Sequence, residues 1–194
     1  MLGHPQGREL LIVAARAVAA DQRGLTLIEL MITIAIGTTL AMMALPMYST
    51  WIASQQVRTA AESVYEGIRV AQTEAVRRNN PVAFELAPAT GWTVKLVSDD
   101  SVLRETKLIE GSPNVEVTVA PANATTVIFD GLGRALDDAQ SPLAARITID
   151  VKTKTGFTDA RAQRVIIDTA AATGVGIRSC DPQLPTGDPR ACPA

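Results

Sequence analysis

One acid interrupts the longest largely apolar run in the chain, and this run sets what the chain can fold into. The run extends from Leu25 to Leu45, 21 residues in which Glu29 is the only charged side chain. At about 1.5 Å per residue, a helix of this length covers roughly 31 Å, the thickness of a bilayer hydrocarbon core. We therefore expect one membrane-spanning helix over residues 25–45.

The residues before the run indicate its orientation. The leader, residues 1–24, carries three arginines against two acids. Basic flanks tend to remain in the cytoplasm, so the N-terminus is predicted inside and the C-terminal part outside. A secretory signal peptide would place its small-residue cleavage site after a shorter apolar segment, whereas here the small residue, Gly24, precedes the run.

Composition excludes the commonest enzyme sites. The chain has 194 residues, a net charge of −2, one histidine (His4) and two cysteines (Cys180 and Cys192). Neither a Ser/His/Asp or Cys/His nucleophilic pair nor a histidine-rich zinc site can be assembled from the body of such a chain. The charge also lacks the basic excess of a nucleic-acid coat. We expect a non-catalytic protein without a cofactor or metal.

Helical periodicity continues beyond the apolar run. Between residues 57 and 75, apolar residues recur at spacings of three and four, and charged residues occupy the other faces. Pro46 removes one backbone donor and should kink or loosen the helix without ending it, whereas the Asn-Asn-Pro sequence at 79–81 should end it. We predict one helix from about Thr26 to Arg78, whose amphipathic second part, residues 46–80, packs on a sheet.

The pattern changes to a period of two after Pro81. Alternating apolar and polar residues, separated by Gly, Pro, Asn and Asp, predict half-buried antiparallel strands. The predicted strands are residues 82–86, 92–97, 115–119, 146–151 and 164–168. One long helix with several short strands predicts an α+β fold, with a β-rich globular domain over residues 81–179 and a C-terminal tail over residues 180–194.

The start of the apolar run resembles a known processing signal. The sequence GLTLIEL at residues 24–30 is similar to the class III signal of type IV prepilins and of the pseudopilins of type II secretion. In that family the prepilin peptidase, a membrane aspartyl peptidase, cuts after the glycine and methylates the new N-terminus, here Leu25. Pro46, with Tyr48 just beyond it, also lies where many members carry a proline and a tyrosine. Leu25 departs from the usual phenylalanine, and the leader of 24 residues is long for the family.

The resemblance implies a role for Glu29, the one acid inside the apolar run. Cleavage would expose the α-amino group of Leu25 about one helical turn from Glu29, and in a stack of helices the amine of an incoming subunit can meet the Glu29 of an assembled one. A carboxylate at membrane depth costs about 3 kcal/mol on insertion scales, so this pairing supplies a driving force and a register. Thr26, Glu29 and Pro46 are then assembly residues. The alternative is a Glu29 that reaches the interface without a partner.

The globular body is more loosely similar to the branch of minor pilins and pseudopilins that includes FimT and the secretion protein GspH. Two places carry this similarity: residues 127–134, and residues 164–167 leading into 176–182. The sequence GLGR at 131–134 lacks the Lys-Ser/Thr ending and the following helix of a phosphate loop, so we predict a hairpin turn there.

The two cysteines enclose a proline-rich loop at the end of the chain. In an oxidising periplasm, Cys180 and Cys192 are expected to pair, which restrains the tail by about 3 kcal/mol in the chain-entropy model. The alternative, two free thiols or half of a metal site, has no histidine to complete it.

Some FimT-like pilins bind DNA through a C-terminal Gly-Arg-x-Arg stretch, which gives a second hypothesis. This chain keeps only the second arginine of that stretch, Arg178, with Arg164 and Arg190 elsewhere in the C-terminal part. Neighbouring acids offset these three residues, so their neutralisation of phosphates would be weak and readily lost in salt.

The resemblance implies a minor, non-enzymatic subunit of a type IV pilus or a type II secretion pseudopilus. It would be a single-pass inner-membrane protein with a cytoplasmic N-terminus and a periplasmic domain, later inserted near the filament tip to help initiate or cap assembly. Its partners would be other pilins or pseudopilins, the prepilin peptidase and the inner-membrane assembly machinery. The alternatives are a minor pilin that binds DNA during uptake and a singly anchored periplasmic binding domain that never polymerises.

Overall fold

The computed structural model describes residues 24–154, 160–168 and 175–193 of the chain. The predicted leader lies outside the described residues, apart from Gly24. Contacts divide the chain into two compact units, with the boundary between Ala44 and Leu45. This boundary coincides within one residue with the predicted end of the membrane span.

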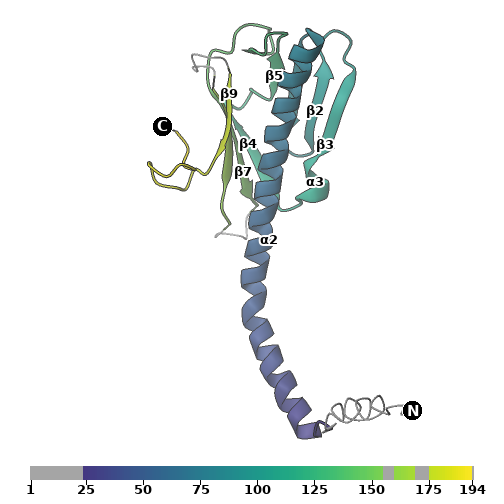
Figure 1. Cartoon of the computed structure of the whole chain (residues 1–194), viewed down its shortest axis with the longest axis vertical. Coiled ribbons are helices and arrows are strands. Elements are labelled where there is room, and N and C mark those ends of the chain that lie inside the picture. The colour runs from purple at the N-terminus through teal and green to yellow at the C-terminus, as the bar shows by residue number, and fades with distance from the viewer. Residues whose placement is uncertain (1–23, 155–159, 169–174, 194) are drawn as a thin grey trace, which may run out of the picture. The chain divides into compact units, whose positions relative to one another are not determined.

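Helix α2, Leu27–Arg78, runs through 52 residues and includes both the apolar run and its amphipathic continuation (Figure 1). Pro46 lies inside the helix and does not end it, as predicted. The helix ends at Asn79, whose φ of +49° is the left-handed conformation that asparagine tolerates at a helix C-terminus. The Asn80 N–H donates to the Ala75 carbonyl (3.2 Å), which satisfies one of the last free acceptors of the helix.

The N-terminal part of α2 presents apolar side chains outward on all sides. Every side chain from residue 24 to 45 is exposed, and α2 is the one described helix that is long and apolar enough to cross a membrane. The hydroxyls of Thr33 and Thr38 donate to the Leu30 and Ile34 carbonyls of the preceding turn (2.9 and 2.7 Å). These bonds leave no free hydroxyl donor at either position, which makes both threonines compatible with lipid.

The C-terminal unit combines the second part of α2 with two antiparallel sheets (Figure 1). One sheet has the strand order β3-β2-β1-β5-β6 and the other β4-β7-β8-β9. The elements after α2 are β1 Val82–Ala87, β2 Gly91–Leu96, β3 Val102–Lys107, the short helix α3 Leu108–Gly111, β4 Val115–Ala120, β5 Thr126–Phe129, β6 Ala135–Leu136, β7 Ile147–Thr153, β8 Gln163–Asp168 and β9 Gly176–Cys180.

A stripe of small and β-branched residues on α2 faces the core. The buried side chains of this stripe are at most 1% exposed and form one cluster with residues of both sheets. They include every residue of the predicted apolar stripe: Val57, Ala60, Ala61, Val64, Ile68, Ala71 and Ala75. On the sheet side, Trp92 packs near Phe84 with ring centroids 6.0 Å apart, and its indole N–H donates to the Ser63 hydroxyl (3.0 Å).

All five strands predicted from alternation are present, with ends shifted by at most two residues. The sequence GLGR at 131–134 forms the turn between the antiparallel strands β5 and β6, which confirms the predicted hairpin. Alternation did not predict β3, β5, β6, β9 or α3. The reason for β3 is physical, because it is an edge strand whose residues are exposed or half-buried without alternation.

Gly67 provides a test of how closely α2 approaches the first sheet. A Cβ added there would lie 2.8 Å from Trp92 Cδ2 and 2.9 Å from Phe84 Cε2. Alanine normally stabilises a helix interior by about 1 kcal/mol relative to glycine, but overpacking against two buried rings should make Gly67→Ala destabilising by about 1–3 kcal/mol. Thermal unfolding of the full chain in detergent, followed by near-UV circular dichroism, measures this change.

Gly111→Ala is the matched control, because no atom lies within 4 Å of its added Cβ. It should change the free energy of unfolding by no more than about 0.5 kcal/mol. A Gly67→Ala protein that melts at or above the wild-type temperature would contradict the close helix–sheet contact.

Candidate functional site

Thr26 caps the N-terminus of α2. The Glu29 N–H donates to the Thr26 hydroxyl (3.3 Å), and the Leu30 N–H donates to the Thr26 carbonyl (3.1 Å). A threonine followed three residues later by glutamate is the sequence of a capping box, in which the hydroxyl satisfies a free helix donor. Thr26 was not predicted as a helix cap, although the spacing that signals a cap is readable in the sequence.

Glu29 is an exposed acid in the first turn of α2, and its own helix offers it no cation nearby. The next charged residue along the chain is Arg58, far beyond the reach of an i, i+4 ion pair. The positive end of the helix dipole favours a carboxylate at this position but does not neutralise it. A full counter-charge for Glu29 must therefore come from residues before α2 or from another molecule.

The C-terminal tail is closed by the predicted disulfide. Cys180 and Cys192 are bonded with their Cα atoms 5.0 Å apart. Inside the loop, the Asp181 N–H donates to the Arg190 carbonyl (2.8 Å), and the buried Asp181 carboxylate accepts the Gln183 N–H (2.9 Å). These contacts give the tail a defined conformation at the end of β9.

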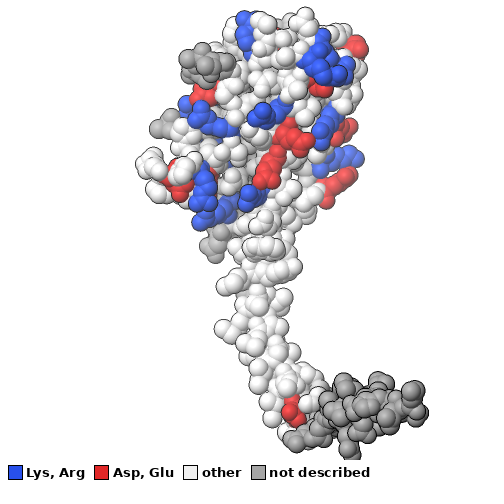
Figure 2. Space-filling model, viewed as in Figure 1, with Lys and Arg blue, Asp and Glu red and all other residues white. Residues whose placement is uncertain are grey.

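A groove of about 550 Å³ lies between α2 and this tail. Arginines from three separate segments line it: Arg58, Arg161 and Arg190. Each has an acid within ion-pair distance, namely Glu62 at 2.9 Å, Asp181 at 3.7 Å and Asp188 at 3.5 Å respectively. The groove is thus close to charge balance, and Figure 2 shows acidic and basic side chains interspersed over this face of the domain.

The three arginines predicted as DNA contacts lie on β8, on β9 and in the C-terminal tail. Arg164 on β8 donates to the Asp150 carboxylate through two bonds (2.6 and 2.9 Å), which raises the pKa of its guanidinium. Arg178 on β9 lies opposite Ile166 of β8, and of the three only Arg190 lines the groove. DNA contact by these residues stays a prediction.

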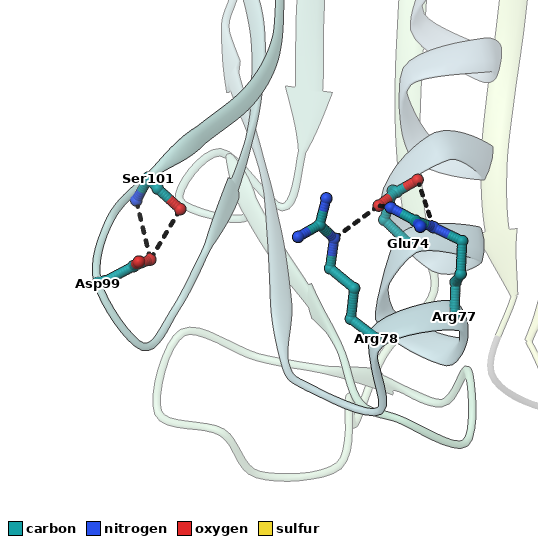
Figure 3. Close-up of polar contacts among 5 residues, drawn as sticks. All are labelled: Glu74, Arg77, Arg78, Asp99 and Ser101. Atoms are coloured by element: carbon teal, nitrogen blue, oxygen red, sulfur yellow. Dashed lines mark hydrogen bonds and ion pairs between the residues drawn. The ribbon is translucent and has the colours of Figure 1, made fainter.

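The last turn of α2 carries a separate charged cluster (Figure 3). The Glu74 carboxylate accepts hydrogen bonds from Arg77 (2.6 and 3.1 Å) and Arg78 (2.7 Å). These bonds lower the pKa of Glu74 from 4.5 to about 2. In the turn after β2, the Ser101 hydroxyl and N–H donate to Asp99 (2.8 and 3.2 Å) and lower the pKa of its carboxyl (Figure 3). Both sets of bonds are local and serve the ends of secondary structure elements.

Comparison with known proteins identifies the family. Residues 60–171, more than half of the chain, match the family described as Type II transport protein GspH. The chain belongs to the GspH family. Residues 20–45 match the prokaryotic N-terminal methylation motif, which includes the predicted cleavage site and Glu29. GspH-family proteins are structural pilins or pseudopilins, which assemble into filaments with other pilins.

Two solved structures are similar to this chain at low sequence identity. One is the type IV minor pilin FimU of Pseudomonas aeruginosa, with 16% identity over 66% of this chain and 94% of that chain and a TM-score of 0.49. The other is the minor pseudopilin EpsH from the type 2 secretion system of Vibrio cholerae, with 15% identity over 66% of this chain and 99% of that chain and a TM-score of 0.47. No curated protein matches the sequence.

The lowered pKa of Glu74 predicts a pH-dependent contribution to stability. The folded pKa of about 2 lies below the unpaired value of 4.5, so the contribution is complete above pH 4.5 and is lost as the pH falls toward 2. The difference in free energy of unfolding between wild type and Glu74→Gln should therefore shrink across this window. Chemical denaturation at several pH values measures it.

Removing both partners is the control for the Glu74 cluster. In a protein carrying Arg77→Ala and Arg78→Ala, NMR titration of the Glu74 carboxyl should give a midpoint near 4.5. A wild-type Glu74 that already titrates there would contradict the role of the two arginines.

Proposed function

We propose that this GspH-family protein is a minor subunit of a type IV pilus or a type II secretion pseudopilus, cleaved after Gly24 and methylated on Leu25, which helps initiate or cap filament assembly. The observation that carries the proposal is the overlap of two features at one place. The methylation motif over residues 20–45 coincides with the start of the one described helix that can span a membrane.

The local structure at the cleavage site supports processing. Gly24 and Leu25 are exposed and precede the first residue of α2. Backbone outside secondary structure is where peptidases act most readily. The cap at Thr26 begins the helix just after the new N-terminus, so cleavage would leave α2 intact.

We infer a topology with the leader in the cytoplasm and the globular domain in the periplasm. Basic residues before a span favour the cytoplasmic side, and the disulfide between Cys180 and Cys192 suits an oxidising compartment. In this state the prepilin peptidase and the assembly machinery of the inner membrane are the partners.

The span itself suits packing against other helices. Gly37, Ala41 and Ala44 recur at spacings of four and three, which places small residues along one side of the apolar helix. Small residues separated by three positions allow close approach of helices where burial of apolar surface offers no net gain. A singly anchored domain that never polymerises has no need of this pattern, nor of a glutamate in the span that finds no cation on its own helix.

Mass spectrometry of the mature protein tests the proposal. Protein purified from the membrane fraction should begin at Leu25 and carry one N-methyl group, because the peptidase cleaves and then methylates. Gly24→Val, which blocks the site sterically, should keep the leader. A wild-type protein with an intact leader in a strain with active peptidase would favour the singly anchored alternative.

Replacing Glu29 tests its assembly role. Glu29→Gln removes the charge that pairs with the Leu25 amine, and a loss of about 1.4 kcal/mol or more at that contact lowers incorporation by about tenfold or more. Quantitative immunoblotting of sheared filaments against the membrane fraction measures this ratio. Glu62→Gln, an exposed acid elsewhere on α2, is the matched control and should incorporate normally. If the Glu29→Gln protein is incorporated as efficiently as wild type, pairing of Glu29 with the Leu25 amine does not drive assembly.

A further inference from the structure

Two exposed aromatic residues lie on α2 just beyond the apolar run. Tyr48 and Trp51 are one turn apart and stack, with ring centroids 6.0 Å apart and planes inclined by 25°. They are 60% and 58% exposed, whereas Trp92 in the domain core is 2% exposed. Among the helix residues whose burial is described, the first buried one is Ala53, two positions after Trp51. The aromatic pair thus belongs neither to the core nor to the apolar run.

The spacing of charges along α2 places this pair relative to a bilayer. No charged residue occurs from Leu30 to Val57, a length of about 42 Å in a helix, which equals the thickness of a bilayer with both headgroup layers. Figure 2 shows this uncharged stretch as a white column. The Cα atoms of Tyr48 and Trp51 lie about 4.5 and 9 Å beyond that of Leu45 along the axis. Helical side chains tilt toward the N-terminus, which brings both rings nearer to the hydrocarbon.

We infer that Tyr48 and Trp51 form an anchor in the outer headgroup layer of the inner membrane, with lipid as their partner before assembly. This inference rests on the proposed membrane insertion of α2. Tyrosine and tryptophan are enriched at membrane interfaces because their rings are apolar and their O–H and N–H groups reach headgroups and water. Within the described part of the chain, neither the Tyr48 hydroxyl nor the Trp51 indole N–H has a hydrogen-bond partner.

The anchor has a consequence for Glu29 at the other end of the span. Tyr48 lies nineteen positions after Glu29, about 28.5 Å along a helix, which is close to the thickness of the hydrocarbon core. With Tyr48 held among the outer headgroups, the Glu29 carboxylate lies at the inner edge of the hydrocarbon. The aromatic pair therefore fixes how deep in the bilayer the Glu29 carboxylate lies before it pairs with the amine of another subunit.

Tryptophan fluorescence of the full chain in lipid vesicles tests the anchor. The vesicles contain phosphatidylcholine and phosphatidylglycerol brominated either near the headgroup or near the bilayer centre. The chain has two tryptophans, so the difference between wild type and Trp51→Phe isolates the Trp51 signal without changing the buried Trp92. We expect the Trp51 signal to be quenched about twofold or more by the shallow bromines relative to the deep ones. Trp92, the tryptophan left in Trp51→Phe, should be quenched by neither.

Extraction of the vesicles with carbonate separates failure of the anchor from failure of the proposed function. If the chain stays in the membrane but Trp51 is quenched no more than Trp92, or equally by shallow and deep bromines, the anchor is wrong and membrane insertion stands. Loss of the chain into the carbonate wash would overturn both the anchor and the proposed membrane insertion of α2. Shallow quenching that persists when the lipid-to-protein ratio is raised supports lipid, and not a second copy of the chain, as the partner of Trp51.

Discussion

Helix α2 has to meet two different surroundings along one continuous backbone, and this constraint organises the chain. Up to Leu45 every described side chain points outward, and all of them except Glu29 are compatible with hydrocarbon, whereas from Ala53 onward one side of the helix is buried in a protein core. Only seven residues lie between these two positions. A helix serves both surroundings because its backbone hydrogen bonds are internal and do not depend on what lies outside.

The second part of α2 determines how closely the two sheets approach the helix. Its buried stripe consists largely of alanine and valine, so the sheets approach closely and the large side chains come from the strands, as Trp92 and Phe84 do at Gly67. A stripe of large residues on the helix would hold the sheets farther away and leave voids between the aromatic rings. The charged residues on the open side of α2 pair locally, for example Arg58 with Glu62, and leave the packing face uninterrupted.

Sequence patterns predicted the elements whose signal is local. The helix, five strands, the β5–β6 turn and the disulfide follow from periodicity, turn residues and the cysteine count. The edge strand β3 could not be predicted in this way, because neither of its faces is consistently buried. The groove between α2 and the tail also could not, because the arginines that line it, Arg58, Arg161 and Arg190, come from segments far apart in the sequence. Likewise, pairing of Arg164 with Asp150 requires the β7–β8 register, which alternation alone does not fix.

The Thr26 cap at the start of α2 separates helix initiation from the proposed assembly role of the Glu29 carboxylate. The cap uses the backbone N–H of Glu29 and the hydroxyl of Thr26, so it does not consume the carboxylate. The side chain keeps its charge available for an amine, while Thr26 fixes the first turn from which that charge projects. Exchange of glutamate for glutamine keeps the N–H and the shape but removes the charge, whereas exchange of Thr26 for alanine removes the cap and keeps the charge. If Glu29→Gln reduces incorporation into filaments and Thr26→Ala does not, the cause is therefore electrostatics between molecules and not helix initiation.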